Sequence, residues 1–198
     1  RQTDLPESYH YARTAHICPV DYLTHSLIPA ALRQIGINTI TLDPGKGYMQ
    51  SEFWDLLPTL ISGLNAFIPA EEDLRELFKG RSEDVWEMAE AFGNLGSRFV
   101  VIKSGANGQF LWDSDAKKRW HVPAFPTKIR NVTGAGDSYC GGFLTGLDET
   151  QNIIEAALRG SVSASIAIEG VGPMYTLESM KELAETRFEA LKPAVREI

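Results

Sequence analysis

The sequence predicts an α/β fold, a three-layer α/β/α sandwich in which helices cover both faces of a mainly parallel sheet. Short apolar, often β-branched segments alternate with longer amphipathic segments, and glycine or proline separates many of them. No internal repeat or low-complexity linker interrupts this order. The chain has 198 residues, 43% hydrophobic and 23% charged, so it can bury a full core. We expect residues 1–198 to form one globular domain.

The first elements form a strand–helix–strand unit. Residues 14–19 are a short apolar segment closed by a proline, which is typical of a buried strand. Residues 24–35 carry apolar side chains at helical spacing, including Leu27, and stop at Gly36. Residues 38–42 are β-branched and predict the next strand. Because strands joined by a helical crossover are normally parallel, we expect functional loops at their carboxyl ends.

The same alternation continues through the middle of the chain. Proline and clustered acidic residues mark the beginnings of its helices. The expected elements are a helical segment over 53–64 with a new helix starting near Pro58, a strand over 66–69, a helix over 70–78, and a helix over 84–95 with Ser82 as its N-cap.

The last part of the chain begins with its strongest strand signal, the apolar segment 98–103. A glycine-rich turn at 105–108 and a second apolar segment at 109–112 predict a hairpin. Residues 118–122 predict an edge strand, and three helices are expected over 136–147, 151–168 and 177–191.

The segment from Asn131 to Phe143 carries the most chemical information. Its small residues Gly134, Ala135 and Gly136 let several backbone N–H groups point outward at the positive end of a helix, which favours an anion. Asp137 follows in the first turn of the same helix. One turn later, the Gly141–Gly142 pair removes side chains from that helix face, which permits close approach to the sheet or to a ligand.

Phosphoryl transfer needs this combination of an anion hole and a carboxylate. The donors hold the transferred group, and the carboxylate orients the attacking hydroxyl and accepts its proton. An acidic residue in a first turn also interacts favourably with the helix dipole, so without further context Asp137 has an ordinary structural explanation too.

Composition excludes several other classes of protein. A formal net charge of −7 and an isoelectric point near 5.1 oppose binding to nucleic acid. No apolar segment approaches the ~20 residues of a membrane helix, and no leader opens the chain, so we expect a cytoplasmic protein. The histidines have no metal-binding spacing, and the absence of a Walker A pattern excludes a P-loop kinase.

The glycine-rich segment resembles the second signature of the ribokinase-like PfkB family of carbohydrate kinases, usually D-T-T-G-A-G-D followed by a small residue, an aromatic residue and a glycine-rich helix. Upstream and downstream landmarks resemble the family in order, among them Asp43-Pro44, Phe53-Trp54 and Gly172-Pro173. The matching signature positions are Gly134, Ala135, Gly136, Asp137, Tyr139, Gly141, Gly142 and Phe143.

The resemblance implies an ATP- and Mg²⁺-dependent kinase that phosphorylates a hydroxyl of a sugar or sugar-like alcohol. It implies Asp137 as catalytic base and Gly134, Ala135 and Gly136 as the anion hole. The implied nucleotide-binding residues are Lys103, Ser104, Gly105, Gly108, Gly160, Ser161 and Ala164, although tight helix packing explains the last three equally well.

Three positions depart from the family pattern. Where the family has P-N-x-x-E, this chain has Pro69-Ala70-Glu71-Glu72-Asp73, which leaves Asp73, with Glu71, as the expected Mg²⁺-organising carboxylates or as ordinary dipole partners. Asn131 replaces an aspartate of a K⁺ site that would also involve Thr133 and Gly172. Lys103 stands where a small or apolar residue is usual, and either reaches the phosphates or extends from a strand end.

The resemblance also implies a longer protein. We expect this sequence to be the C-terminal portion of a ribokinase-like domain, with the substrate-binding residues and lid in an absent N-terminal part. An exposed sheet edge and weak or no activity of this portion alone would follow. A nucleoside kinase of the same fold and a non-catalytic nucleotide-binding relic remain alternatives, and a homodimer of the full-length protein remains open.

Overall fold

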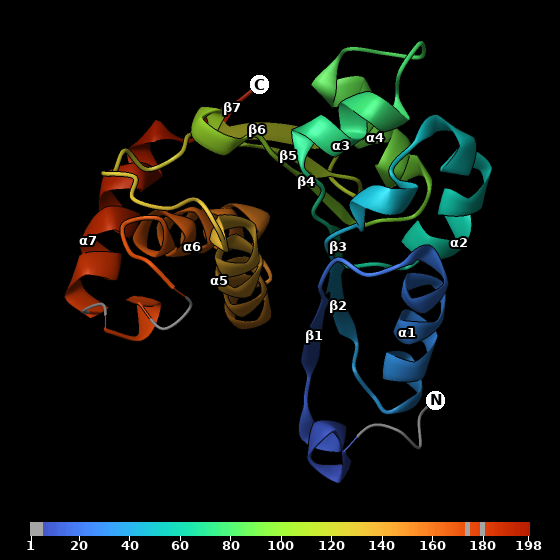
Figure 1. Cartoon of the computed structure of the whole chain (residues 1–198), viewed down its shortest axis with the longest axis horizontal. Coiled ribbons are helices and arrows are strands. Elements are labelled where there is room, and N and C mark those ends of the chain that lie inside the picture. The colour runs from blue at the N-terminus through green and yellow to red at the C-terminus, as the bar shows by residue number, and fades with distance from the viewer. Residues whose placement is uncertain (1–5, 173–174, 179–180) are drawn as a thin grey trace. The chain divides into compact units, whose positions relative to one another are not determined.

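The computed structural model describes residues 6–172, 175–178 and 181–198. Its strands belong to a seven-stranded sheet in which they follow one another in sequence order, β1 to β7 (Figure 1). The chain divides into two compact units. The first unit comprises Arg1–Ile102 with Trp112–Lys117, and the second comprises Lys103–Leu111 with Lys118–Ile198.

The first unit contains the parallel strands that the alternating sequence pattern predicts. Each pairs with the next in parallel register, for example Thr14 opposite Thr39 and Ala66 opposite Phe99. Parallel pairing follows from the crossover connections between these strands. The elements are β1 (Thr14–Ile17), α1 (Tyr22–Gln34), β2 (Thr39–Leu42), β3 (Ala66–Phe67) and β4 (Phe99–Lys103), the last of which ends in the second unit.

Helix α1 begins earlier than its apolar spacing predicts. The Asp21 carboxylate accepts a hydrogen bond from the Thr24 N–H at 3.0 Å, so Asp21 is the N-cap. Leu27, one of the apolar side chains whose spacing predicts this helix, is 62% exposed, and Leu23 one turn earlier is 65% exposed. Strand β1 is the first strand in the sheet order. That its edge would be covered by an absent N-terminal part stays a prediction.

The remaining elements of the first unit are short helices. Asp84, and not Ser82, is the N-cap of α4, because the Asp84 side chain accepts from the Trp86 N–H at 2.7 Å. Ser82 instead accepts from the Asp84 N–H at 3.1 Å. These elements are η2 (Glu7–Tyr11), η3 (Lys46–Tyr48), η4 (Ser51–Leu56), α2 (Leu57–Ile61), α3 (Glu71–Leu77) and α4 (Val85–Asn94).

Aromatic side chains build the core of the first unit. The rings of Phe67 and Phe92 lie 4.6 Å apart, and Trp54 meets Phe78 edge-on at 5.0 Å. Such pairs stabilise a fold beyond the apolar area they bury, by about 0.5–1.5 kcal/mol each. Helix α4 is therefore anchored to strand β3 through Phe92.

The second unit holds the three long C-terminal helices. Strand β6 is not the edge strand that the sequence predicts, because β7 pairs with it in antiparallel register, with Trp120 opposite Glu197. The sheet is therefore mixed. The elements are η5 (Gly105–Asn107), β5 (Gln109–Asp113, shared with the first unit), β6 (Lys118–Val122), α5 (Ala135–Thr150), α6 (Ile153–Ala167), η6 (Tyr175–Glu178), α7 (Lys181–Leu191), η7 (Lys192–Ala194) and β7 (Arg196–Glu197).

Helices α5 and α6 pack closely, with α7 against α6 (Figure 1). A Cβ atom on Gly142 would lie 2.7 Å from the Arg159 carbonyl oxygen and 2.8 Å from the Ser163 Cβ. The close approach that the glycine pair predicts is therefore to α6, and not to the sheet or a ligand. Gly141, by contrast, has open space on its Cβ side.

Candidate functional site

The site in the second unit is built around the N-terminus of α5. Gly134 is its N-cap and has φ = +81°, in the left-handed region that glycine adopts without strain. Through this turn the chain enters a 16-residue helix directly at Ala135. A helix of this length has a positive dipole end and unsatisfied N–H groups at its start.

The N–H groups at this helix start are not all available to a ligand. The Ala135 N–H donates to the Val132 carbonyl oxygen at 3.1 Å, which removes it from the predicted anion hole. Within the described chain, the Gly134, Gly136 and Asp137 N–H groups donate to no acceptor. The N–H groups open to an anion at this helix start are thus those of Gly134, Gly136 and Asp137, and the anion hole at Gly134, Ala135 and Gly136 stays a prediction.

Asp137 lies in the first turn of α5 with an exposed side chain. Its carboxylate makes no ion pair or hydrogen bond with any residue in the described ranges. A carboxylate held in a structural salt bridge could not accept a proton readily, so this arrangement leaves Asp137 accessible to an incoming hydroxyl.

Lys103, at the end of β4, extends toward the same helix start. Its ammonium nitrogen lies 3.5 Å from where a Cβ on Gly136 would be and 3.9 Å from the Cys140 sulfur. Gly136 therefore leaves room for a positive charge beside the N–H groups. A cation and helix-terminal amides converging on one point favour an oxyanion.

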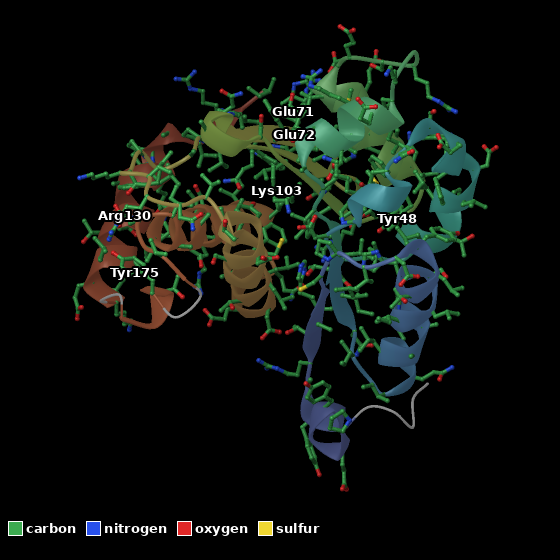
Figure 2. All side chains as sticks on the ribbon, in the orientation of Figure 1. Tyr48, Glu71, Glu72, Lys103, Arg130 and Tyr175 are labelled. Atoms are coloured by element: carbon green, nitrogen blue, oxygen red, sulfur yellow. The ribbon has the colours of Figure 1, made fainter. Side chains whose placement is uncertain are left out.

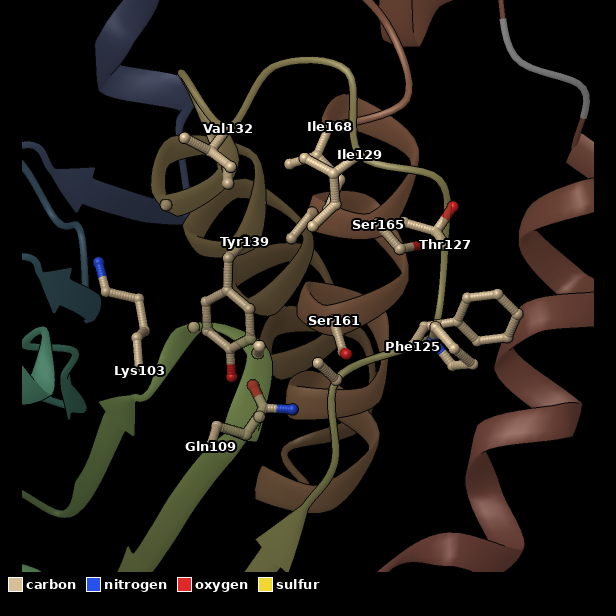
Figure 3. Close-up of a pocket in the computed structure, with 18 residues that line it drawn as sticks. Lys103, Gln109, Phe125, Thr127, Ile129, Val132, Tyr139, Ser161, Ser165 and Ile168 are labelled. Atoms are coloured by element: carbon tan, nitrogen blue, oxygen red, sulfur yellow. The ribbon is translucent and has the colours of Figure 1, made fainter.

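A cavity of about 430 Å³ adjoins this helix start (Figure 3). Its volume falls in the range of small-molecule sites, and its wall is largely apolar. Lys103 and Gly136 line it together with residues of the β4–β5 turn, the segment after β6, and α6. Representative lining residues are Gly105, Gly108, Phe125, Tyr139, Ser161 and Ala164.

The structure thus brings most of the predicted nucleotide-binding residues together. Lys103, Gly105, Gly108, Ser161 and Ala164 line the cavity. Gly160 and Ser104 are not among its lining residues. Gly160 lies against the Tyr139 ring, since a Cβ there would be 2.7 Å from the ring, whereas the Ser104 N–H closes the turn to the Gly108 carbonyl oxygen at 2.8 Å. Their nucleotide-binding role remains a prediction.

An ion pair that the sequence did not reveal holds one wall of the cavity. The Arg187 guanidinium is buried and donates to the Glu169 carboxylate at 2.7 Å and to the Ser165 hydroxyl at 2.9 Å. It also lies over the Phe125 ring at 5.0 Å, and Thr127 donates to Glu169. Burial alone would raise the pKa of Glu169, but the hydrogen bonds from Thr127 and Arg187 and the Arg187 charge hold it below its usual range.

The predicted magnesium carboxylates belong to the first unit. Glu71 and Glu72 lie at the beginning of α3 (Figure 2), and the Arg75 guanidinium donates to Glu71, with its Nε at 3.0 Å. Asp73 lines a surface hollow with Lys46 and Lys79. No group of three or more His, Cys, Asp or Glu in residues 6–172, 175–178 and 181–198 is arranged to hold a metal ion. The Mg²⁺ role of Asp73 and Glu71 stays a prediction.

The predicted monovalent-cation residues lie near the start of α5 and beyond the end of α6. The Asn131 side-chain oxygen accepts the Thr133 N–H at 2.9 Å, so one of its lone pairs is used in a local turn. Gly172 has φ = +91° and is exposed. A K⁺ ion at these residues likewise stays a prediction.

The fold and this site define an α/β protein whose helix N-terminus is suited to an anion. The chain belongs to the pfkB family of carbohydrate kinases, whose family model matches residues 28–180. An uncharacterized sugar kinase of Archaeoglobus fulgidus is 29% identical over 135 residues, which is 68% of this chain and 52% of that protein. A cytidine kinase of Thermococcus kodakarensis is 27% identical over 158 residues, or 79% and 55% of the two chains.

The ribokinase of Arabidopsis thaliana, solved with ribose and ATP, has the same fold. The TM-score is 0.72 at 19% identity, over 92% of this chain and 58% of that one. The chain therefore spans about half the length of the curated relatives it matches. None of the helices in the described residues is long and apolar enough to cross a membrane.

Proposed function

We propose that this chain carries the nucleotide and phosphoryl-transfer site of an ATP-dependent kinase that acts on a hydroxyl of a sugar or sugar-like alcohol. The observation that carries the proposal is the position of Asp137. Its unpaired carboxylate lies next to the N–H groups of Gly136 and of Asp137 itself, which have no acceptor among the described residues. Membership of the family supports the same reaction.

In the proposed reaction, Asp137 accepts the proton of the substrate hydroxyl as its oxygen attacks the terminal phosphorus of ATP. The bond from that phosphorus to the bridging oxygen breaks, so the products are the phosphate ester and ADP. The N–H groups of Gly134, Gly136 and Asp137 and the Lys103 ammonium stabilise the charge on the transferred group. Among the described residues, no group of three or more His, Cys, Asp or Glu side chains is arranged to hold Mg²⁺.

The cavity beside α5 is proposed to hold the nucleoside part of ATP. Its apolar wall provides surface for the base, and Lys103 and Gly136 line it near the anion-binding N–H groups. The Arg187–Glu169 pair keeps Phe125 and Ser165 in place on that wall. ATP can therefore lie with its base between α6 and the segment after β6 and its phosphates at the start of α5.

A nucleoside is the second candidate acceptor. The match to a cytidine kinase covers 79% of this chain, more than the 68% covered by the sugar kinase match. The two candidates share the phosphoryl-transfer site and differ in the residues that bind the acceptor.

A kinase assay on the full-length protein tests the proposal. ADP formation from ATP is measured with a panel of sugars and a panel of nucleosides. Turnover dependent on a sugar supports the first candidate, and turnover dependent on a nucleoside supports the second. Binding of ATP without turnover on either panel would contradict the proposed phosphotransferase function.

A further inference from the structure

Few of the side chains that line the cavity beside α5 could hydrogen-bond a ligand, because most of its wall is apolar (Figure 3). One of them, Lys103, lies beside the start of α5, where the phosphates are proposed to bind. A nucleotide base in the apolar part of the cavity would therefore meet only the remaining polar side chains. These belong to Gln109, Thr127, Tyr139, Ser161 and Ser165.

The serine and threonine hydroxyls in this wall donate to groups of the protein. Ser165 donates to a carbonyl oxygen of α6 at 2.7 Å. Thr127 donates to the Glu169 carboxylate. Ser161 donates to the Pro123 carbonyl oxygen at 3.5 Å, the longest of these bonds. Because a hydroxyl has a single proton to donate, each of these donors is used within the protein.

The two larger polar side chains in the wall are buried. Tyr139 is 5% exposed and Gln109 is 2% exposed. The Tyr139 hydroxyl oxygen is inaccessible to solvent and points toward Gln109 (Figure 3). The Gln109 amide nitrogen donates to the Ala157 carbonyl oxygen at 3.3 Å. A ligand in the cavity thus meets the tyrosine ring and not its hydroxyl.

Two apolar side chains at the cavity are exposed. Ile129 is 59% exposed and Val132 is 65% exposed, and both line the cavity. The chain between them is held in place, because the N–H groups of Arg130 and Asn131 donate to the Ile168 carbonyl oxygen at 2.8 and 3.2 Å. A flat ring that covers such side chains removes apolar surface from water, which favours binding.

We propose that Ile129 and Val132 hold the base of the nucleotide by apolar contact and that no side chain of the described residues reads its polar edge. GTP then serves as phosphoryl donor as well as ATP, and the products are the phosphate ester and GDP. This inference rests on the proposed nucleotide site and adds the base selectivity of that site.

Adenine and guanine are the informative pair of bases. Their fused rings have the same size, but adenine carries an amino donor where guanine carries a carbonyl acceptor. A side chain that paired with one of these edges would be left unpaired against the other and would reject it. Apolar surface responds to the area of the ring, which the two bases share.

Calorimetric titration of the full-length protein with ATP, GTP and inorganic tripolyphosphate tests the inference. We expect the affinities for ATP and GTP to agree within about 3-fold, less than most single hydrogen bonds would contribute. Ile129→Ala should weaken both nucleotides alike, by roughly 3- to 10-fold, and leave tripolyphosphate unchanged, because it removes apolar surface and no charge. Ile198→Ala is the matched control, since Ile198 is 56% exposed in the same unit and does not line the cavity.

A larger preference for ATP or for GTP would overturn the inference, because it would mean that a group of the protein, such as a main-chain group of the segment after β6, reads the edge of the base. This comparison uses the unchanged protein, so it is independent of how a variant folds. Unchanged nucleotide affinity in Ile129→Ala would also overturn the inference, as would a loss of tripolyphosphate binding. Failure of the unchanged protein to bind ATP, GTP and tripolyphosphate would overturn the proposed nucleotide site itself.

Discussion

The Arg187 guanidinium on α7 donates to the Glu169 carboxylate, which follows α6, at 2.7 Å, with only 8% of the arginine side chain exposed. Both residues also hold parts of the cavity wall, through Ser165 and Phe125 on one side and Thr127 on the other. This ion pair, in which the arginine is buried and the glutamate half-buried, thus connects α7 with the proposed nucleotide cavity.

Replacing Arg187 by methionine should destabilise the second unit. The substitution leaves the half-buried Glu169 carboxylate without its charged partner, and the loss of such a hydrogen-bond partner costs about 1–3 kcal/mol. Thermal and chemical unfolding measure the loss. Lys181→Met is the control, because Lys181 and Glu185 form an exposed pair at 3.5 Å that contributes little. Equal stability of the two variants would contradict this role of Arg187.

Stability should also depend on the charge of Glu169. The pKa of Glu169 is lower in the folded protein than in the unfolded chain. The stabilisation from its ionised carboxylate is therefore fully present above the ordinary glutamate pKa of about 4.3. The contribution is lost as the pH falls through the lower, folded-state pKa. The melting temperature of the unchanged protein should therefore exceed that of Glu169→Gln near neutral pH. This difference in melting temperature should narrow in acid. A constant difference from pH 7 to pH 3 would contradict a stabilising role for the charge of Glu169.

The two adjacent glycines in α5 should respond in opposite directions to alanine. In Gly142→Ala the new methyl group would meet the Arg159 carbonyl oxygen, and overpacking of this kind costs about 1–3 kcal/mol. In Gly141→Ala it would meet nothing within 4 Å, so higher helix propensity should stabilise the protein by up to about 1 kcal/mol. Denaturant unfolding measures the free energy of unfolding of both variants. The prediction is wrong if Gly142→Ala is the more stable of the two.

Much of this arrangement could be predicted from the sequence because it depends on local patterns. The apolar segment 14–19 and the β-branched segment 38–42 predicted β1 and β2, and Gly134 to Asp137 predicted a helix start with an acid in its first turn. The apolar spacing of residues 24–35 predicted a helix but did not show which of its apolar side chains are buried, and Leu27 is exposed. Nor did they show which element Gly142 approaches, since that depends on residues of α6 far along the chain.

The features that the sequence did not reveal depend on tertiary contacts. Strand β7 is a charged two-residue segment, Arg196–Glu197, and has no strand signal without its partner β6. Arg187 lies in a helix with many charged residues, where nothing distinguishes it from a solvated arginine. The hydrogen bond from the Ala135 N–H to the Val132 carbonyl oxygen likewise depends on the conformation of the turn, which the sequence pattern does not specify.

Lys103 should contribute to binding of the phosphates through its charge. Lys103→Met should weaken the binding of both ATP and tripolyphosphate roughly 10- to 150-fold, because a charge-assisted contact contributes about 1.5–3 kcal/mol. Lys118→Met is the control in the same unit, since that lysine pairs with Glu197 at 2.8 Å. Calorimetric titration at two salt concentrations shows whether the loss of affinity depends on charge. Unchanged affinity for tripolyphosphate would show that Lys103 only extends from the end of β4 and does not contact the phosphates.

The most direct test of the central claim is the activity of Asp137→Asn in the full-length protein. Loss of the general base should lower kcat by about 10²- to 10⁴-fold while ATP affinity is retained. Asp148→Asn, about 16 Å further along the same helix at 1.5 Å per residue, should leave kcat unchanged. An Asp137→Asn protein that phosphorylates its acceptor at the unchanged rate would contradict the assignment of Asp137 as the base.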